Sequence, residues 1–392
     1  MSKTIRDRFG VWASMVLCAS ASVLAAGPDL RLVTAAAEQD KAAVRALLKE
    51  RVNVNSARGD GSTALLWAAH WNDLEMVDLL LRAGAQVNAP DDHGVTPLAR
   101  GAENGDLAMT ERLLTAKANA NAAETSGRTP LMIAAKTGNV QVVKALLVHG
   151  ANVNATTADG NTALMWAIAE RHDDLARVLV EGQADVRATS TRGFTPLMFA
   201  ARNGDIEMAR TLMAAGARVN DTTPDGTHLL PFAIVSGQVD FAMFLLEQGA
   251  DANGSMGGMK ALHTAAGSSD LWLTEWYRQH GLGGGYAAVG SARVDAARRA
   301  QLVRALLARG ADVNSRATTS AMQMTYIAYP TKGAFESFAC GTGDLLGATP
   351  LWVAANAASG NQLQLMEVMG APRTEGYGEV VRALLQKGRN AH

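Results

Sequence analysis

The stretch RTPLMIAAKTGNVQVVKALLVHGANVNA, residues 128–155, carries the signals of two short helices in succession. Thr129 can cap the first helix, and Pro130 suits its first position, where a missing N–H costs nothing. Gly138 can end that helix because it has no Cβ to oppose a left-handed turn. Apolar side chains then recur at helical spacing along one side of a second helix: Val142, Val143, Leu146 and Leu147. The stretch therefore predicts a helix, a turn and a second helix.

The same pattern recurs every 33 residues. Its anchors are five threonines and one histidine: Thr63, Thr96, Thr129, Thr162, Thr195 and His228. Successive units are joined by segments with a tight-turn pair that suits a β-hairpin tip: Asp60-Gly61, His93-Gly94, Ser126-Gly127, Asp159-Gly160 and Asp225-Gly226. Because one unit cannot bury its apolar side alone, the units are expected to stack into an elongated array.

This repeat resembles the ankyrin repeat, over about residues 29–388. The resemblance implies an all-α repeat solenoid of about nine helix-turn-helix-hairpin repeats. Residues 27–55 are expected to form an N-terminal capping repeat, in which Leu30 stands where the capping threonine should be. Residues 56–253 correspond to six regular repeats, and residues 254–392 to two repeats with insertions.

Aromatic and glycine-rich insertions are expected in the C-terminal repeats, at about residues 268–298, 317–347 and 358–378. In the first, Ser269 or Asp270 is expected to cap a short helix that places Trp272 and Trp276 one turn apart, and Ser291 to cap a following long helix. The second is expected to form a long β-finger, and the third to separate two helices. We expect the two tryptophans to cover the apolar end of the stack or to extend its binding surface.

Residues 1–26 have the organisation of a signal peptide. Basic residues precede an apolar run from Val11 to Leu24, and Ala25 or Ala26 offers a cleavage site. We therefore expect a secreted or periplasmic protein. An uncleaved N-terminal anchor is the alternative, although the run is short for a membrane span. After cleavage only Cys340 remains, so no intramolecular disulfide is expected.

Composition and motifs give no sign of catalysis. The 392 residues are 48% hydrophobic with a formal net charge of −1, which gives no reason to expect nucleic acid or an anionic membrane as a partner. The motifs of P-loop, zinc-protease and serine-hydrolase sites are absent, and Tyr286 interrupts the dinucleotide-binding pattern in residues 281–290. His263 and the recurring Met132, Met165 and Met198 are interpreted as structural. No catalytic residue, cofactor or metal is therefore expected.

The ankyrin resemblance implies a protein partner bound in a concave groove of hairpin tips and first helices. The residues it places there are Asp60, Ser62, His70, Trp71, Asp92, His93, Glu103, Asn104, Arg128, Lys136, Asn161, Glu170, Arg192, Phe194, Arg202 and Asn203. One alternative is a ligand-binding or enzymatic site around the C-terminal aromatic residues: Trp272, Trp276, Tyr277, Tyr286 and Tyr326. Another is a secreted effector that uses the same scaffold in a host cell.

Overall fold

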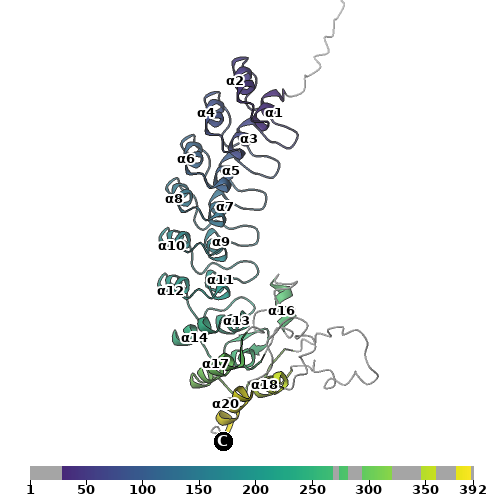
Figure 1. Cartoon of the computed structure of the whole chain (residues 1–392), viewed down its shortest axis with the longest axis vertical. Helices are drawn as coiled ribbons and strands as arrows, with labels where there is room; N and C mark the ends of the chain where they lie inside the picture. Colours follow the sequence, from purple (N-terminus) through teal and green to yellow (C-terminus); the bar gives the residue numbers. More distant parts are fainter. Residues whose placement is uncertain (1–28, 268–272, 281–293, 320–345, 359–376, 390–392) are drawn as a thin grey trace, which may run out of the picture.

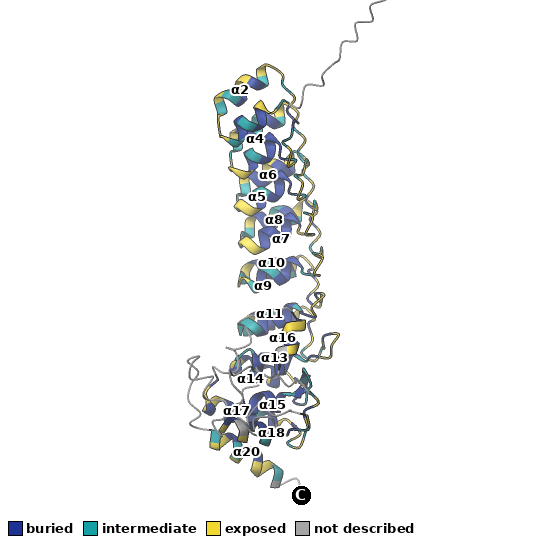
Figure 2. Ribbon diagram, turned by 90° about the vertical axis from the view of Figure 1, so that its right-hand side faces the viewer, coloured by how far each residue is buried: buried dark blue, intermediate teal, exposed yellow. Residues whose placement is uncertain are grey.

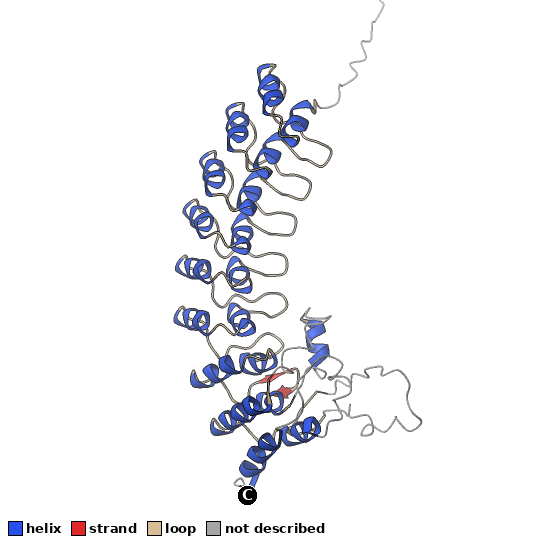
Figure 3. Cartoon of the chain, viewed as in Figure 1, coloured by secondary structure: helices blue, strands red, loops and turns tan. Residues whose placement is uncertain are grey.

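The computed structural model describes residues 29–267, 273–280, 294–319, 346–358 and 377–389. Within these residues the chain is a curved stack of helix pairs, and the loops that connect successive pairs project from one side of the stack (Figures 1 and 3). Apart from one two-stranded sheet, its regular secondary structure is helical. The expected all-α repeat architecture is confirmed.

Each helix pair consists of a first and a second helix. The first helices are α1 (Arg31–Ala37), α3 (Ala64–His70), α5 (Pro97–Asn104), α7 (Pro130–Thr137), α9 (Ala163–Ala169), α11 (Pro196–Asn203) and α13 (Leu229–Val235). The second helices are α2 (Lys41–Lys49), α4 (Leu74–Arg82), α6 (Leu107–Thr115), α8 (Val140–Val148), α10 (Asp173–Glu181), α12 (Ile206–Ala214) and α14 (Val239–Glu247). The C-terminal part contains β1 (Ser255–Met256), β2 (Met259–Lys260), α15 (Ala261–Ala266), α16 (Thr274–Gln279), α17 (Ala296–Ala308), α18 (Pro350–Ala358) and α20 (Tyr377–Arg389).

The recurring threonines cap the first helices, as the sequence predicts. Thr129 Oγ1 accepts a hydrogen bond from the backbone N–H of Met132 at 3.4 Å, and equivalent bonds form at Thr63, Thr96, Thr162 and Thr195. Pro130 occupies the first turn of α7, and Gly138 ends that helix with a φ of +86°. His228 is different, because its side chain makes no cap bond and its Nδ1 lies 3.2 Å from the backbone N–H of Ser255.

Short polar side chains also cap most of the second helices, a role that was not singled out from the sequence. Asp73, Asp106, Asn139 and Asp205 each accept a bond from a backbone N–H of the first turn. These residues follow the 33-residue period, so the signal was present in the sequence.

The core runs along the stack between the first and second helices (Figure 2). Val142, Val143 and Leu146 are fully buried, and Leu147 is half-buried against them. The recurring methionines are buried too, which confirms their structural interpretation. Alanines in the first helices, such as Ala134 and Ala135, are also fully buried. Small side chains at these positions let neighbouring first helices approach closely.

The projecting loops end in tight turns. In one of them Thr157 N–H donates to the Asn161 carbonyl at 3.0 Å, and Gly160 N–H donates to the Thr157 carbonyl at 2.8 Å. Neighbouring tips are linked directly, as where Thr191 N–H donates to the Asp159 carbonyl at 2.9 Å. The predicted turns are present, but among the described residues these tips form isolated bridges at most rather than regular hairpin strands.

The C-terminal part departs from the regular pattern after α15. The short helix α16 begins at Thr274 without a side-chain cap, whereas the predicted caps Ser269 and Asp270 lie outside the described residues, as does Trp272. The long helix α17 begins at Ala296 and is capped by Asp295, so the expected start near Ser291 was wrong. The proposed β-finger and most of the third insertion also lie outside the described residues.

Candidate partner-binding face

The predicted contact residues lie in the connecting loops, within the first helices or directly after them. The loop tips project from one side of the stack (Figure 1). Eleven of the predicted contact residues are exposed: Asp60, His70, Trp71, Asp92, His93, Glu103, Asn104, Arg128, Lys136, Glu170 and Arg192. Asn161, Arg202 and Asn203 are half-buried, whereas Ser62 and Phe194 are buried. The set therefore contains accessible side chains together with some that serve the fold.

Three predicted contact residues connect neighbouring repeats. Asn104 Nδ2 donates to the Ala69 carbonyl at 2.9 Å, and Asn203 Nδ2 donates to the Ile168 carbonyl at 2.7 Å. Trp71 Nε1 donates across the preceding interface to the Ala37 carbonyl at 3.1 Å. The Ala69 and Ile168 carbonyls also accept bonds from backbone N–H groups of the turns that follow their helices. The side-chain bonds are therefore additional, and they connect each helix end to the neighbouring repeat.

Ser62 is part of a structural network rather than an exposed contact. Its hydroxyl donates to Asp60 at 2.6 Å and accepts from Trp67 Nε1 at 3.2 Å. Hydrogen bonds from the Ser62 side chain and backbone lower the pKa of Asp60. The carboxylate of this tip is consequently held in the ionised form, with Trp67 fixed beside it.

A concavity on this face lies between the repeats of α9 and α11, with a volume of about 410 Å³. Five predicted contact residues line it: Asn161, Glu170, Arg192, Phe194 and Arg202. Asp159, on the same tip as Asn161, also lines it, as do Trp166, Phe199 and His280, which were not among the predicted residues. Trp166 and Phe199 are 33 residues apart and occupy the same half-buried position in the middle of their first helices, so the repeat pattern could have identified them. His280 comes from a different repeat and has no local sequence signal.

Two cationic side chains lie over aromatic rings of this pocket. Lys136 Nζ lies 5.4 Å from the centre of the Trp166 ring, and the Arg202 guanidinium lies 5.0 Å from that of Phe199. Such cation–π contacts hold flexible cationic side chains over rigid aromatic surfaces. The pocket therefore offers both charges and apolar walls to a ligand.

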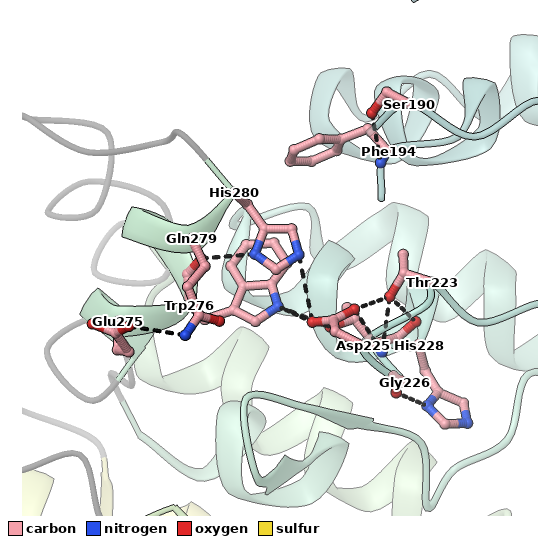
Figure 4. A network of polar contacts seen from close by, with 11 residues as sticks. Ser190, Phe194, Thr223, Asp225, Gly226, His228, Glu275, Trp276, Gln279 and His280 are labelled. Atoms are coloured by element: carbon pink, nitrogen blue, oxygen red, sulfur yellow. Dashed lines mark hydrogen bonds and ion pairs between the residues drawn. The ribbon is translucent and has the colours of Figure 1, made fainter. Parts of the chain in front are cut away.

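Helix α16 packs against the loop tip before α13 and forms one boundary of the pocket (Figure 4). Trp276 Nε1 donates to Asp225 Oδ2 at 2.9 Å and lies 2.8 Å from Thr227 Oγ1. His280 stacks on Trp276 with ring centres 3.9 Å apart, and its Nε2 lies 3.4 Å from Asp225 Oδ2. The helix is thus anchored to the tip by an indole, an imidazole and a carboxylate.

Burial, the largest single effect, raises the pKa of Asp225, whereas hydrogen bonds from Thr223 and Thr227 lower it. The positive charge of a protonated His280 and the bond from Trp276 act in the same direction, so the net pKa lies below its ordinary value. An ionised Asp225 is therefore the acceptor that α16 meets at neutral pH.

Phe194 does not fulfil the expected role of an exposed contact. It is only 7% exposed, because its ring packs against Trp276, His280 and Phe232 at centre distances of 5.9–6.4 Å. The same repeat position is also buried at Ser62, Val95 and Thr227, so a place on the tip does not by itself make a side chain accessible. At Phe194, the α16 segment adds Trp276 and His280 as packing partners. The interaction between the two segments could not be read from the repeat pattern.

The alternative aromatic site in the C-terminal part gains no accessible surface from its described members. Trp276 and Tyr277 are 4% and 7% exposed, and Trp272, Tyr286 and Tyr326 lie outside the described residues. His263 is fully buried, with Nε2 2.9 Å from the Ala348 carbonyl, and burial lowers its pKa. This confirms its structural interpretation.

Among the described residues, no group of three or more potential metal-binding side chains occurs. In the same part of the chain, no helix has the length and apolar character needed to cross a membrane.

Comparison with known proteins identifies the repeat. A family model described as ankyrin repeats (3 copies) matches residues 32–123, 98–190 and 197–276, which together cover more than half of the chain. No curated protein matches the chain.

Proposed function

Because the chain belongs to the ankyrin-repeat family, whose repeats generally mediate protein–protein interaction, we propose that it is a non-enzymatic scaffold for a partner protein. The partner binds the concave face formed by loop tips and first helices. Nine repeats, with insertions in the last two, give this face its length. Its mechanism is rigid presentation, since a preformed surface loses little conformational freedom on binding.

The pocket between the repeats of α9 and α11 is the observation that carries this proposal. It gathers Glu170, Arg192 and Arg202 with the aromatic walls of Trp166 and Phe199. Arginine and tryptophan are among the side chains that dominate binding energy at protein interfaces. Each of these pocket side chains belongs to a first helix, to the end of one, or to a hydrogen-bonded tip. The surface is therefore formed before a partner binds.

Capture of partners with the full chain tests the proposal. Proteins retained by the wild type should be lost from a variant with Glu170→Lys and Arg192→Glu, which inverts two charges of the pocket while leaving the core intact. The matched control, Glu181→Lys with Arg177→Glu, inverts two exposed charges on α10. Partners that bind both variants as well as the wild type would place the interaction elsewhere and refute the proposed face.

We also propose that the protein acts outside the cytoplasm, on the strength of the signal-like residues 1–26. These residues lie outside the described structure, so the support comes from sequence alone. Cell fractionation combined with mass determination of the mature chain tests this point. A cytoplasmic protein that retains Met1 and the apolar run would contradict it.

A further inference from the structure

From the repeat of α7 to that of α13, the charges selected on the concave face change sign from one repeat to the next. Six residues, called here the charge series, show this: Lys136, Asp159, Glu170, Arg192, Arg202 and Asp225. Lys136 lies at the end of α7, and the two acidic residues that follow it flank α9. The two arginines lie before and within α11, and Asp225 lies on the tip before α13. The order along the stack is therefore positive, negative, positive, negative.

Several members of the charge series are not neutralised by the chain itself. Asp159, Glu170 and Arg192 make no ion pair and no side-chain hydrogen bond with any residue in the described part of the structure. Arg128 on the tip before α7 differs, because its guanidinium pairs with Glu124 at 2.7 Å. Uncompensated charges on a preformed surface favour a partner of complementary charge.

Asp225, the last member of the charge series, is already contacted by a helical segment of the chain itself. At Asp225 the chain supplies α16, whose His280 Nε2 lies 3.4 Å from the carboxylate. His280 Nδ1 lies 2.8 Å from the Trp276 carbonyl, so both ring nitrogens face oxygen atoms. An imidazolium carries a proton on each of these nitrogens. A helix on this face thus presents a potential cation to the acidic member (Figure 4).

We infer that the partner is a helical segment with acidic, basic and acidic residues facing the repeats of α7, α9 and α11, next to the position that α16 already occupies. This inference rests on the proposed function. The first helices of neighbouring repeats pack about 8–10 Å apart, and a helix rises 1.5 Å per residue. The complementary charges therefore recur about every seven residues along the partner, on one face of its helix.

The pocket between α9 and α11 is where the sign changes and where the partner's central residue enters. Asp159 and Glu170 line the α9 side of this pocket, and Arg192 and Arg202 line its α11 side. A basic side chain placed on the α9 side meets the two carboxylates, and its aliphatic stem meets the Trp166 and Phe199 rings. The acidic residues on either side of it then face Lys136 and Arg192. Because this charge order is symmetric, it fits either direction of the partner helix along the groove.

Two synthetic helical peptides test the inference with the full chain. One carries Glu, Lys and Glu at intervals of about seven residues on an alanine- and glutamine-rich background, and the other carries Lys, Glu and Lys at the same positions. Fluorescence anisotropy at low salt should show at least about five-fold tighter binding of the first peptide. The preference should shrink as the salt concentration is raised.

Inverting the charge series should invert this preference. A variant with Lys136→Glu, Glu170→Lys and Arg192→Glu is expected to bind the Lys-Glu-Lys peptide more tightly. The control with Lys144→Glu, Arg177→Glu and Glu181→Lys, on the exposed sides of α8 and α10, should keep the wild-type preference. Equal binding of both peptides, no binding of either, or an unchanged preference in the inverted variant would overturn the inference. If the inference fails while capture still depends on Glu170 and Arg192, the proposed function survives without it.

Discussion

The regular repeats and the repeat of α15 and α17 satisfy the ends of their first helices in different ways. In the regular repeats a side chain of the following repeat donates to the last carbonyls, as Asn203 does to Ile168 and Gln238 to Arg202. In the repeat of α15, Arg299 of α17 donates to the Gly267 carbonyl at 3.0 Å and to the Ala265 carbonyl at 3.3 Å. In the regular repeats, these hydrogen bonds come from different side chains at many interfaces between repeats. In the C-terminal repeat they come from one buried arginine.

The position of Arg299 explains why one residue can replace several. It is 1% exposed and also donates to the carbonyls of Val294 and Thr264. A guanidinium presents five donors in a fixed plane, so it can reach several carbonyls that leave a helix in different directions. The chain after α15 is thereby free to depart from the repeat and still leave that helix with satisfied ends.

The largest expected effect follows from Arg299→Met. The change removes the donors and leaves buried carbonyls without partners, which we expect to cost about 3–5 kcal/mol in the stability of the C-terminal repeats. Urea unfolding followed by circular dichroism should show an early transition of this part, separated from the unfolding of the regular array.

The control for Arg299 is Arg304→Met on the same helix. The Arg304 side chain is 57% exposed and pairs with Glu379 at 2.6 Å, so its loss should cost less than about 1 kcal/mol. Equal effects of the two substitutions would show that the buried hydrogen bonds of Arg299 stabilise the C-terminal repeats no more than the exposed ion pair of Arg304 does.

A smaller effect is expected from Trp276→Phe, which keeps a smaller aromatic ring and removes the N–H that meets Asp225 and Thr227. Loss of these bonds should lower the free energy of local opening of α16 by about 1–3 kcal/mol, with little change in the regular repeats. Hydrogen exchange of the α16 amides measures this opening.

Trp71→Phe provides the matched control, because it removes an indole N–H that bonds to Ala37 at the other end of the stack. The exchange of α16 should be the same in this variant as in the wild type. If α16 exchanges equally fast with Trp276 or Phe at its centre, the helix is held by ring packing alone.

The comparison also shows what could be predicted from sequence. The regular repeats were predictable because each cap, core position and turn recurs with a fixed period, as Thr129 and Gly138 illustrate. The roles of Arg299 and His280 were not, because each contacts residues far away in sequence and neither has a counterpart in the other repeats. Phe194 was assigned correctly to a tip, but its contacts with Trp276 and His280 had no signal in the repeat pattern.

Asn203→Ala tests the arrangement in the regular repeats, where separate interfaces each have their own side-chain bond to a helix end. The change removes one inter-repeat bond to the Ile168 carbonyl, and we expect a loss of about 1 kcal/mol. Chemical denaturation should show a lower midpoint with the same slope, since the extent of unfolding is unchanged. Asn220→Ala removes two inter-repeat bonds, one to the Gly249 carbonyl and one from the Asp251 N–H, and should have at least as large an effect. A loss at Asn203 as large as that at Arg299 would contradict the contrast between the two regions.

The smallest effect is expected at Asp173, where one regular repeat departs from its neighbours. The equivalent residues Leu74, Leu107, Val140 and Ile206 are apolar. Asp173 has a buried Oδ1 atom without a hydrogen-bond partner, and burial, followed by the nearby Asp205 carboxylate, raises its pKa. The folded chain therefore binds this proton more tightly than the unfolded chain, and ionisation destabilises the interface between α10 and α12.

Asp173→Asn removes this charge and should stabilise the protein at pH 7 by up to about 1 kcal/mol. The advantage of the variant should disappear below about pH 4, the ordinary range of an aspartate, because the wild-type carboxyl is then protonated in both states. It should grow as the pH rises through the raised pKa of the folded chain. Unfolding midpoints of both proteins across this pH range measure the difference. A difference independent of pH would show that Asp173 acts through its shape rather than its charge, and the regular repeats would then tolerate a buried carboxylate without electrostatic cost.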